Sequence, residues 1–245
     1  MMVDVSAKED VPRFAVASAE AKVEDASSCV VAAAVAARQA YKYIPLLHPV
    51  PLSASALCGD ARVETRAWTL WKTGVEMDAL FGALVGSIAA GATSVGRLRV
   101  ELKVKGEEHE LEEPKGAVKV PRPDLGYIVK AVGYIHLRST EPIKSGSVEK
   151  GDPICAARIV APLNAKRLCE LLPVECARLE YANSKIEVGG DIVTVEVVLK
   201  SRDISPSLEA LFAAGSALLT IWDMVKKYEK DEKGQYPYTY IELGL

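Results

Sequence analysis

Two charged residues near the C-terminus stand at a spacing that suits proton transfer. Asp223 and Lys226 are three residues apart in a segment that is expected to be helical, so their side chains share one face and can pair. A carboxylate beside a lysine positions the ammonium and favours its charged form. We therefore expect Lys226 to act as an acid, a base or a phosphate contact, with Asp223 orienting it. The ordinary alternative is a surface ion pair that contributes little free energy.

Residues elsewhere in the chain have types that could complete such a site. Lys150 stands on a Gly-Asp turn, where a mobile side chain can reach a substrate. His48 precedes a proline, which restricts its backbone to extended conformations, and histidine titrates near neutral pH. Glu76 and Asp78 flank Met77 where a strand is expected to give way to a helix. His48 and Glu76 also have structural alternatives, because a lone histidine is more often structural and an acid at a helix start commonly stabilises that end.

Hydrophobic periodicity predicts the elements that must hold these residues. Residues 191–200 alternate apolar and polar side chains, which predicts a strand with one packed face. The segment that follows has an apolar stripe at three- and four-residue steps, which predicts a long helix. The pair Ser205-Pro206 is favourable for opening that helix. Two further helices are expected at about 29–41 and about 156–171.

The chain resembles itself at an offset of roughly half its length. Placing Leu80-Phe81 on Leu211-Phe212 gives an offset of 131 residues. Placing Ile44-Pro45-Leu46 on Leu172-Pro173-Val174 gives an offset of 128 residues. Two blocks in the same order favour an internal duplication over chance similarity between apolar helices.

The order of elements within each half indicates the fold class. A β-rich start, a helix, an extended stretch, a strand and a second long helix are typical of an α+β sandwich of ferredoxin-like type. We expect one repeat over 1–106, a charged linker with three prolines over 107–124, and a second repeat over 125–245. Sheets of this type commonly pack together, so the two tandem repeats are expected to form an intrachain pseudo-dimer.

Composition narrows the class of function. Lysine and arginine number 30 against 33 acids, and the net charge of −3 argues against a general nucleic-acid binder. No run approaches the roughly 18 apolar residues of a membrane span, and the N-terminus lacks the form of a signal peptide. We therefore expect a cytoplasmic protein with no membrane partner. The five cysteines show no CxxC pair, which favours reduced thiols and supports no zinc or other metal site.

Five motifs in a fixed order carry a resemblance to a known family. They are Met2–Lys8 (MVDVSAK), Ile44–Pro49 (IPLLHP), Lys72–Leu80 (KTGVEMDAL), a block of Lys150–Asp152, Ala157–Ile159 and Ala165–Arg167, and Leu219–Lys226 (LTIWDMVK). Together they resemble the cyclic pyranopterin monophosphate synthases of molybdenum cofactor biosynthesis. The resemblance covers almost the whole chain, and five ordered motifs are specific where any one would be only suggestive.

The resemblance implies a reaction and a set of site residues. Members convert a 3′,8-cyclised dihydro-GTP intermediate into cyclic pyranopterin monophosphate and pyrophosphate, a lyase reaction for which we expect no cofactor. The implied catalytic residues are Lys150, Asp223, Lys226 and His48. The implied substrate-binding residues are Glu76, Met77 and Asp78, with Arg138, Arg158, Lys166 and Arg167 for the phosphates. For Arg158, Lys166 and Arg167 the alternative is a half-buried structural salt link.

The motifs are divided between the halves, whereas an ordinary member carries all of them in one copy. The first half keeps His48, Glu76 and Asp78 but has Ala92 and Val95 where the family has its aspartate and lysine. The second half keeps Lys150, Asp223 and Lys226 but has Cys176 and Ser207 where the family has its histidine and first glutamate. Random decay is not expected to remove complementary sets. The division therefore predicts one composite site between the halves and one inert counterpart.

The resemblance implies a hexamer built from three dimers, with active sites at the dimer interfaces, so three of these chains are expected to form an equivalent homotrimer. The first alternative function is a catalytically inactive paralogue that binds nucleotide or acts as a scaffolding partner. A second alternative is an unrelated binding module of ferredoxin type.

Overall fold

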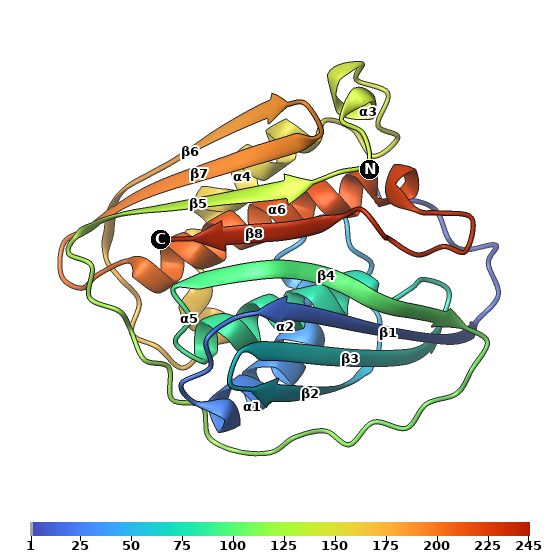
Figure 1. Ribbon diagram of the computed structural model, residues 1–245, viewed down its shortest axis with the longest axis horizontal. Helices are drawn as coiled ribbons and strands as arrows, with labels where there is room; N and C mark the ends of the chain where they lie inside the picture. The colour runs from blue at the N-terminus through green and yellow to red at the C-terminus, as the bar shows by residue number, and fades with distance from the viewer. Residues whose placement is uncertain (1) are drawn as a thin grey trace.

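Alternating apolar residues build eight strands, and every pairing between them is antiparallel. In the computed structural model, which describes residues 2–245, the strands form one sheet in the order β2-β3-β1-β4-β8-β5-β7-β6. Figure 1 shows the long helices gathered behind one face of this sheet. The protein is therefore of mixed α+β class.

The two halves of the chain contribute the same series of strands and long helices. The first half contains β1 (Val11–Glu20), α1 (Ala26–Ala37), the 3₁₀ turn η1 (Ala40–Lys42), β2 (Ser53–Gly59), β3 (Arg62–Trp71), α2 (Glu76–Ala89) and β4 (Ser94–Lys105). The second half contains β5 (Ile128–His136), α3 (Glu141–Lys144), α4 (Pro153–Ala165), α5 (Leu168–Leu171), β6 (Leu179–Gly189), β7 (Ile192–Ser201), α6 (Ser207–Glu229) and β8 (Tyr240–Gly244). The strand order β2-β3-β1-β4 from one edge matches β6-β7-β5-β8 from the other.

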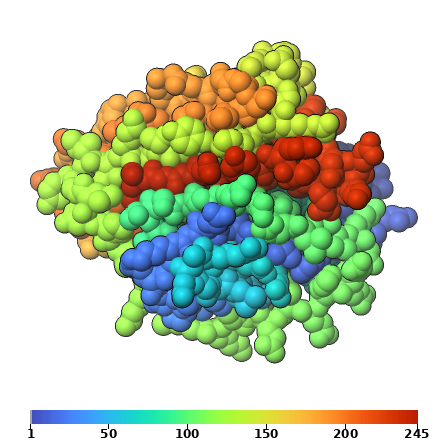
Figure 2. Space-filling view, viewed as in Figure 1, coloured from blue at the N-terminus to red at the C-terminus, as the bar shows by residue number. Residues whose placement is uncertain are grey.

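The halves meet at the last strand of each. Strand β4 pairs with β8 through registers such as Val95 with Leu243 and Leu98 with Ile241, and Figure 2 shows β8 lying directly against β4. This pairing satisfies backbone groups that two separate sheets would leave open at their edges. The expectation that two sheets pack on one another is therefore corrected: their strands continue into a single sheet.

Two helices from different halves form the centre of the core. Every residue of α2 is buried, as is α6 from Ser207 to Val225. A Cβ atom placed on Gly215 of α6 would lie 2.6 Å from Cδ2 of Leu84 on α2, so this glycine permits the close crossing. Helix α6 is long and apolar enough to cross a membrane, but its apolar window is wholly buried, as in the core helix of a soluble protein.

Several predicted elements are confirmed and others change in detail. The predicted strand 191–200 is β7, and the predicted long helix is α6. The proposed cap is wrong: α6 has no side-chain cap, and the Ser205 hydroxyl instead accepts a hydrogen bond from the Leu125 amide. The helix expected at about 156–171 is broken into α4 and α5, because the chain turns after Ala165.

The linker 107–124 contains no helix or strand and follows the outside of the first half (Figure 1). The ring of His109 stacks on Phe14 with 3.8 Å between the centroids. The Lys119 amide donates to the Ser28 hydroxyl over 2.8 Å. The linker is thus held against the first half at both His109 and Lys119.

Four of the five cysteines are paired, which corrects the expectation of reduced thiols. Cys29 is bonded to Cys58, and Cys169 to Cys176. Cys155 is free and exposed. The first pair joins α1 to β2, which pack against each other. The two cysteines are 29 residues apart in the sequence, so their spacing alone does not predict this contact.

Candidate active site

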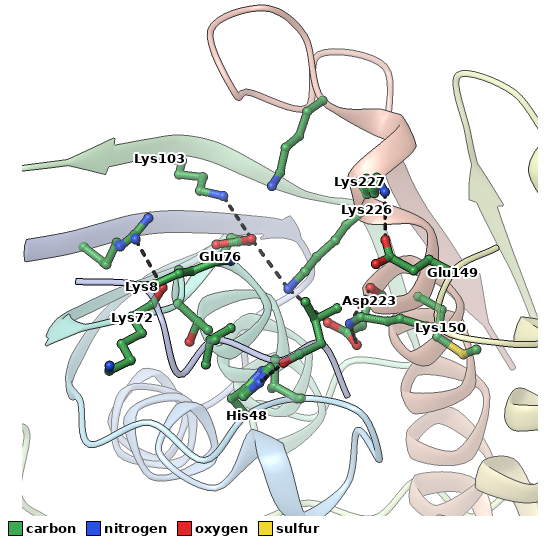
Figure 3. Close-up of a pocket in the computed structure, with 18 of the residues that line it drawn as sticks. Lys8, His48, Lys72, Glu76, Lys103, Glu149, Lys150, Asp223, Lys226 and Lys227 are labelled. Carbon is green, nitrogen blue, oxygen red and sulfur yellow. Dashed lines mark hydrogen bonds and ion pairs between the residues drawn. The ribbon is translucent and has the colours of Figure 1, made fainter. Parts of the chain in front are cut away.

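One cavity of about 250 Å³ lies where the end of α6 meets the start of α2. Its wall combines His48 and Glu76 from the first half with Lys150, Asp223 and Lys226 from the second. Figure 3 shows these side chains converging from different segments. The structure therefore brings together, in one chain, five residues that the sequence analysis assigned to a shared site.

Lys150 and Asp223 form the first ion pair of the cavity. The Lys150 ammonium lies 2.5 Å from Oδ2 of Asp223 and donates to the Asp223 carbonyl over 3.0 Å. Burial lowers the pKa of Lys150, and the nearby Lys226 cation lowers it further, while Asp223 opposes the shift. The result is an amine that releases its proton more readily than an exposed lysine.

Lys226 joins Asp223 to a carboxylate from the other half. Its ammonium lies 3.0 Å from Oδ1 of Asp223 and 3.7 Å from Oε1 of Glu76. Burial would lower the pKa of Lys226, but the two carboxylates outweigh it and raise that pKa above its usual range. Burial would likewise raise the pKa of Asp223, but Lys226 and Lys150 hold it below normal. The pair Asp223 and Lys226 therefore stays ionised.

Glu76 is the most heavily partnered carboxylate in the cavity. Besides Lys226, its Oε1 receives hydrogen bonds from the ammonium of Lys103 and the hydroxyl of Tyr236, both over 3.1 Å. Burial would raise the pKa of Glu76, yet Lys226, Lys103 and Lys230 lower it well below the usual range. Glu76 is consequently an anion that pairs with two ammonium groups and a hydroxyl.

Asp78 and Met77 lie beneath the cavity in the first turn of α2. Asp78 is 2% exposed, and among residues 2–245 its Oδ2 has no hydrogen-bond partner. Burial raises the pKa of Asp78 to about 8, opposed by Lys226 and supported by Glu76. Asp78 is therefore a neutral acid at pH 7, unlike Glu76. Met77 is fully buried in the core, and neither Met77 nor Asp78 lines the cavity.

His48 lies on the opposite wall and is held by the N-terminal segment. Its Nε2 is 2.9 Å from the carbonyl oxygen of Val3. A carbonyl only accepts, so Nε2 carries the proton of this hydrogen bond. Nδ1 is then the nitrogen that can accept a proton when the ring is neutral.

The segment that carries Lys150 is fixed to the last turns of α6. The Tyr228 hydroxyl donates to the Ser147 carbonyl over 3.0 Å and accepts from the Glu149 amide over 3.2 Å. The Lys227 ammonium lies 2.7 Å from Glu149. Helix α6 therefore supplies Asp223 and Lys226 and also positions the segment that presents Lys150.

The four basic residues assigned to phosphate binding do not line this cavity. Arg158 and Lys166 are exposed positions of α4 and its C-cap. Arg167 donates to the Lys42 carbonyl and stacks over Tyr43. The Arg138 side chain is exposed, and its backbone amide donates to Glu229.

Other basic residues, which the sequence analysis missed, surround the cavity instead. They are Lys8, Arg13, Lys72, Lys103 and Lys230. Burial lowers the pKa of Lys230 to about 8, with Lys103 adding to the shift. Lys8 and Lys72 stand inside two of the motifs quoted above and could have been found there. Lys103 reads in sequence as an ordinary outward position of a strand.

No group of three or more His, Cys, Asp and Glu side chains in residues 2–245 is placed to hold a metal ion. The cavity's charged groups are instead paired lysines and carboxylates. Such a set can bind a polyanion and transfer protons.

Comparison with known proteins gives one consistent family. The model of the MoaC family matches residues 21–90 and 126–242. A probable cyclic pyranopterin monophosphate synthase from Sulfolobus acidocaldarius is 47% identical over 115 residues, which are 45% of this chain and 80% of the relative. One with the same name from Archaeoglobus fulgidus is 40% identical over 127 residues, which are 50% of this chain and 81% of the relative.

Among solved structures, an unknown protein from Galdieria sulphuraria covers 96% of this chain and 98% of its own. Its sequence identity is 13% and its TM-score is 0.22, values too low to support an argument about fold or function.

Proposed function

This chain belongs to the MoaC family, and we propose that it is a cyclic pyranopterin monophosphate synthase whose two halves share one active site. Its substrate is a 3′,8-cyclised dihydro-GTP, and its products are cyclic pyranopterin monophosphate and pyrophosphate. One observation carries the proposal: His48 and Glu76 line the same cavity as Lys150, Asp223 and Lys226, although the two sets come from different halves.

The paired lysines have different roles in this proposal. Lys150, whose pKa is lowered by burial, exchanges protons with the substrate. Lys226 stays charged between Asp223 and Glu76 and stabilises negative charge that develops during the rearrangement. Asp223 orients both ammonium groups through its two oxygens.

The remaining groups act on the ring system. His48 presents Nδ1 as a proton acceptor because Nε2 is engaged by Val3. Asp78, protonated at neutral pH, lies beneath Glu76 outside the cavity wall and adds no negative charge to the site. Glu76 stays ionised and holds cationic or N–H groups of the substrate.

The triphosphate binds along the basic side of the cavity. Lys8, Arg13, Lys72, Lys103 and Lys230 supply the positive charge there. This proposal replaces the assignment of the phosphates to Arg138, Arg158, Lys166 and Arg167, whose side chains lie outside the cavity wall.

The repeats 1–106 and 125–245 are ferredoxin-like units, joined by the linker 107–124 into an intrachain pseudo-dimer. The matching strand orders on either side of the β4–β8 pairing support this part of the proposal. Three chains then form a homotrimer that is equivalent to a hexamer of single repeats. We place this enzyme in the cytoplasm.

Turnover of the cyclised intermediate by the purified chain tests the proposal. We expect formation of cyclic pyranopterin monophosphate with one pyrophosphate released per turnover, and loss of both products in Lys226→Met. Absence of turnover where a single-repeat synthase works would support the inactive paralogue instead.

A further inference from the structure

Helices α2 and α6 are equivalent helices of the two repeats. Two equivalent repeats that meet should therefore form two equivalent sites, one at each end of the contact between these helices. The cavity lies where α6 ends and α2 begins. Its counterpart lies where α2 ends and α6 begins. There Glu209 is the third residue of α6, as Asp78 is the third residue of α2. Glu209 is likewise buried, at 2% exposure.

The cation that accompanies Asp78 has no equivalent in the repeat that should supply it. The 131-residue offset places Val95 at the position of Lys226 and Ala92 at that of Asp223. Both residues are 1% exposed. A buried carboxylate such as Glu209 would be costly without a charged or hydrogen-bonding partner.

Arg122 of the linker supplies the missing positive charge. Its Nη1 lies 2.5 Å from Oε2 of Glu209 and its Nη2 lies 2.9 Å from Oε1, which is a two-pronged ion pair. The same guanidinium donates to the carbonyls of Ser205 and Glu175, each over 2.7 Å. Arg122 is thus fully engaged with the second repeat.

The linker residues on either side of Arg122 contact the end of α2 and the start of α6. A Cβ atom on Gly91, just after α2, would lie 2.7 Å from Cγ of Pro121. The Ser207 hydroxyl donates to the Pro123 carbonyl over 2.6 Å. The linker therefore crosses the point where α2 ends and α6 begins, in contact with both helices.

We infer that the linker seals the second, symmetry-related site, with Arg122 neutralising its remaining carboxylate, so that each chain has a single substrate site. The seal itself is argued from the contacts of Arg122, whereas the count of substrate sites rests on the proposed function. It also accounts for the linker's path, which ends at the second repeat.

Thermal unfolding of full-length variants tests the seal. Arg122→Met leaves a buried charge unpaired, so we expect its Tm to fall by about 10 °C. Glu209→Gln removes that charge but keeps an acceptor for the Ala177 amide, which donates to Oε1 over 3.2 Å. The double variant Arg122→Met/Glu209→Gln should recover at least about half of the loss.

The matched control is Arg38→Met, which breaks a partly exposed ion pair between the first repeat and linker residue Glu113. Its Tm should stay within about 2 °C of wild type. If Arg122→Met does not fold, Arg122→Lys can be measured instead. Lysine keeps the positive charge but cannot form the two-pronged pair, so its Tm should fall by less than about 10 °C. A wild-type Tm in Arg122→Met, or no recovery in the double variant, would overturn the seal.

Calorimetric titration with inorganic pyrophosphate tests the number of sites. We expect one pyrophosphate per chain, with binding weakened by Lys103→Met. A second equivalent that Lys103→Met leaves unchanged would contradict a sealed site. If the double variant recovers Tm but the wild-type chain shows no synthase turnover, the proposed function is contradicted while the seal is still supported.

Discussion

The ammonium of Lys226 lies 3.7 Å from Oε1 of Glu76, although Lys226 lies in the last turn of α6 in the second half and Glu76 begins α2 in the first half. Neither half alone contains both groups. The contact therefore makes the charge balance of the cavity depend on how the halves pack, and it explains why each half can lack part of the family's residues.

Replacing Lys226 should affect both activity and stability. Lys226→Met removes the cation between Asp223 and Glu76. We expect kcat to fall at least about 100-fold and the free energy of unfolding to fall by about 3 kcal/mol. The control Lys227→Met breaks an exposed pair with Glu149 one residue away and should keep kcat within about twofold. Equal kinetics in the two variants would remove Lys226 from the chemistry.

The phosphate-binding side can be located by kinetics. Lys103→Met should raise the KM for the cyclised substrate and the inhibition constant of pyrophosphate by about tenfold, since one charge-assisted contact contributes about 1.5 kcal/mol. Lys166→Met, at an exposed helix end, should change neither constant. If Lys166→Met raised both constants and Lys103→Met changed neither, the phosphates would bind beside α4 instead.

Asp78 should give a distinctive dependence of stability on pH. Its folded-state pKa is raised from 3.8 to about 8 by burial, so the folded protein keeps a proton that the unfolded chain has lost. Stability from this group therefore falls as pH rises from about 4 to about 8. Asp78→Asn cannot ionise, so the Tm of the variant minus that of wild type should increase by about 10 °C between pH 5 and pH 8. A constant difference would show that Asp78 is ionised throughout.

Mixing experiments can show whether the site is built within one chain. Glu76→Gln disables the contribution of the first half, and Lys150→Met that of the second. Because both residues line one cavity of the same chain, co-purified assemblies of the two variants should stay inactive. Recovered turnover in the mixture would mean that sites form between chains.

The sequence predicted secondary structure best where a single hydrophobic periodicity dominates a segment. Alternation of single residues located β7, and a long apolar stripe located α6, because both elements have one dominant packing demand. His48 and Lys150 were found in a different way, because they stand inside motifs that resemble those of a known family. Their convergence in one cavity follows from the complementary losses of the two halves.

Contacts between residues that are distant in the chain could not be predicted from the sequence. Lys103 lies on β4, where its distance from Glu76 depends on sheet register and not on local pattern. Arg122 stands in a segment without periodicity, and its partner Glu209 is 87 residues away. The basic residues of α4 were misplaced for the opposite reason: helical spacing shows that they share a face but not which way that face points.

The most direct measurement is turnover of 3′,8-cyclised dihydro-GTP by the wild-type chain and by one variant from each half, Glu76→Gln and Lys150→Met. The account predicts that wild type releases cyclic pyranopterin monophosphate and pyrophosphate, and that each variant loses at least about 100-fold in kcat/KM while remaining folded. Full activity in either variant, or an inactive wild type beside an active single-repeat synthase, would contradict a composite site.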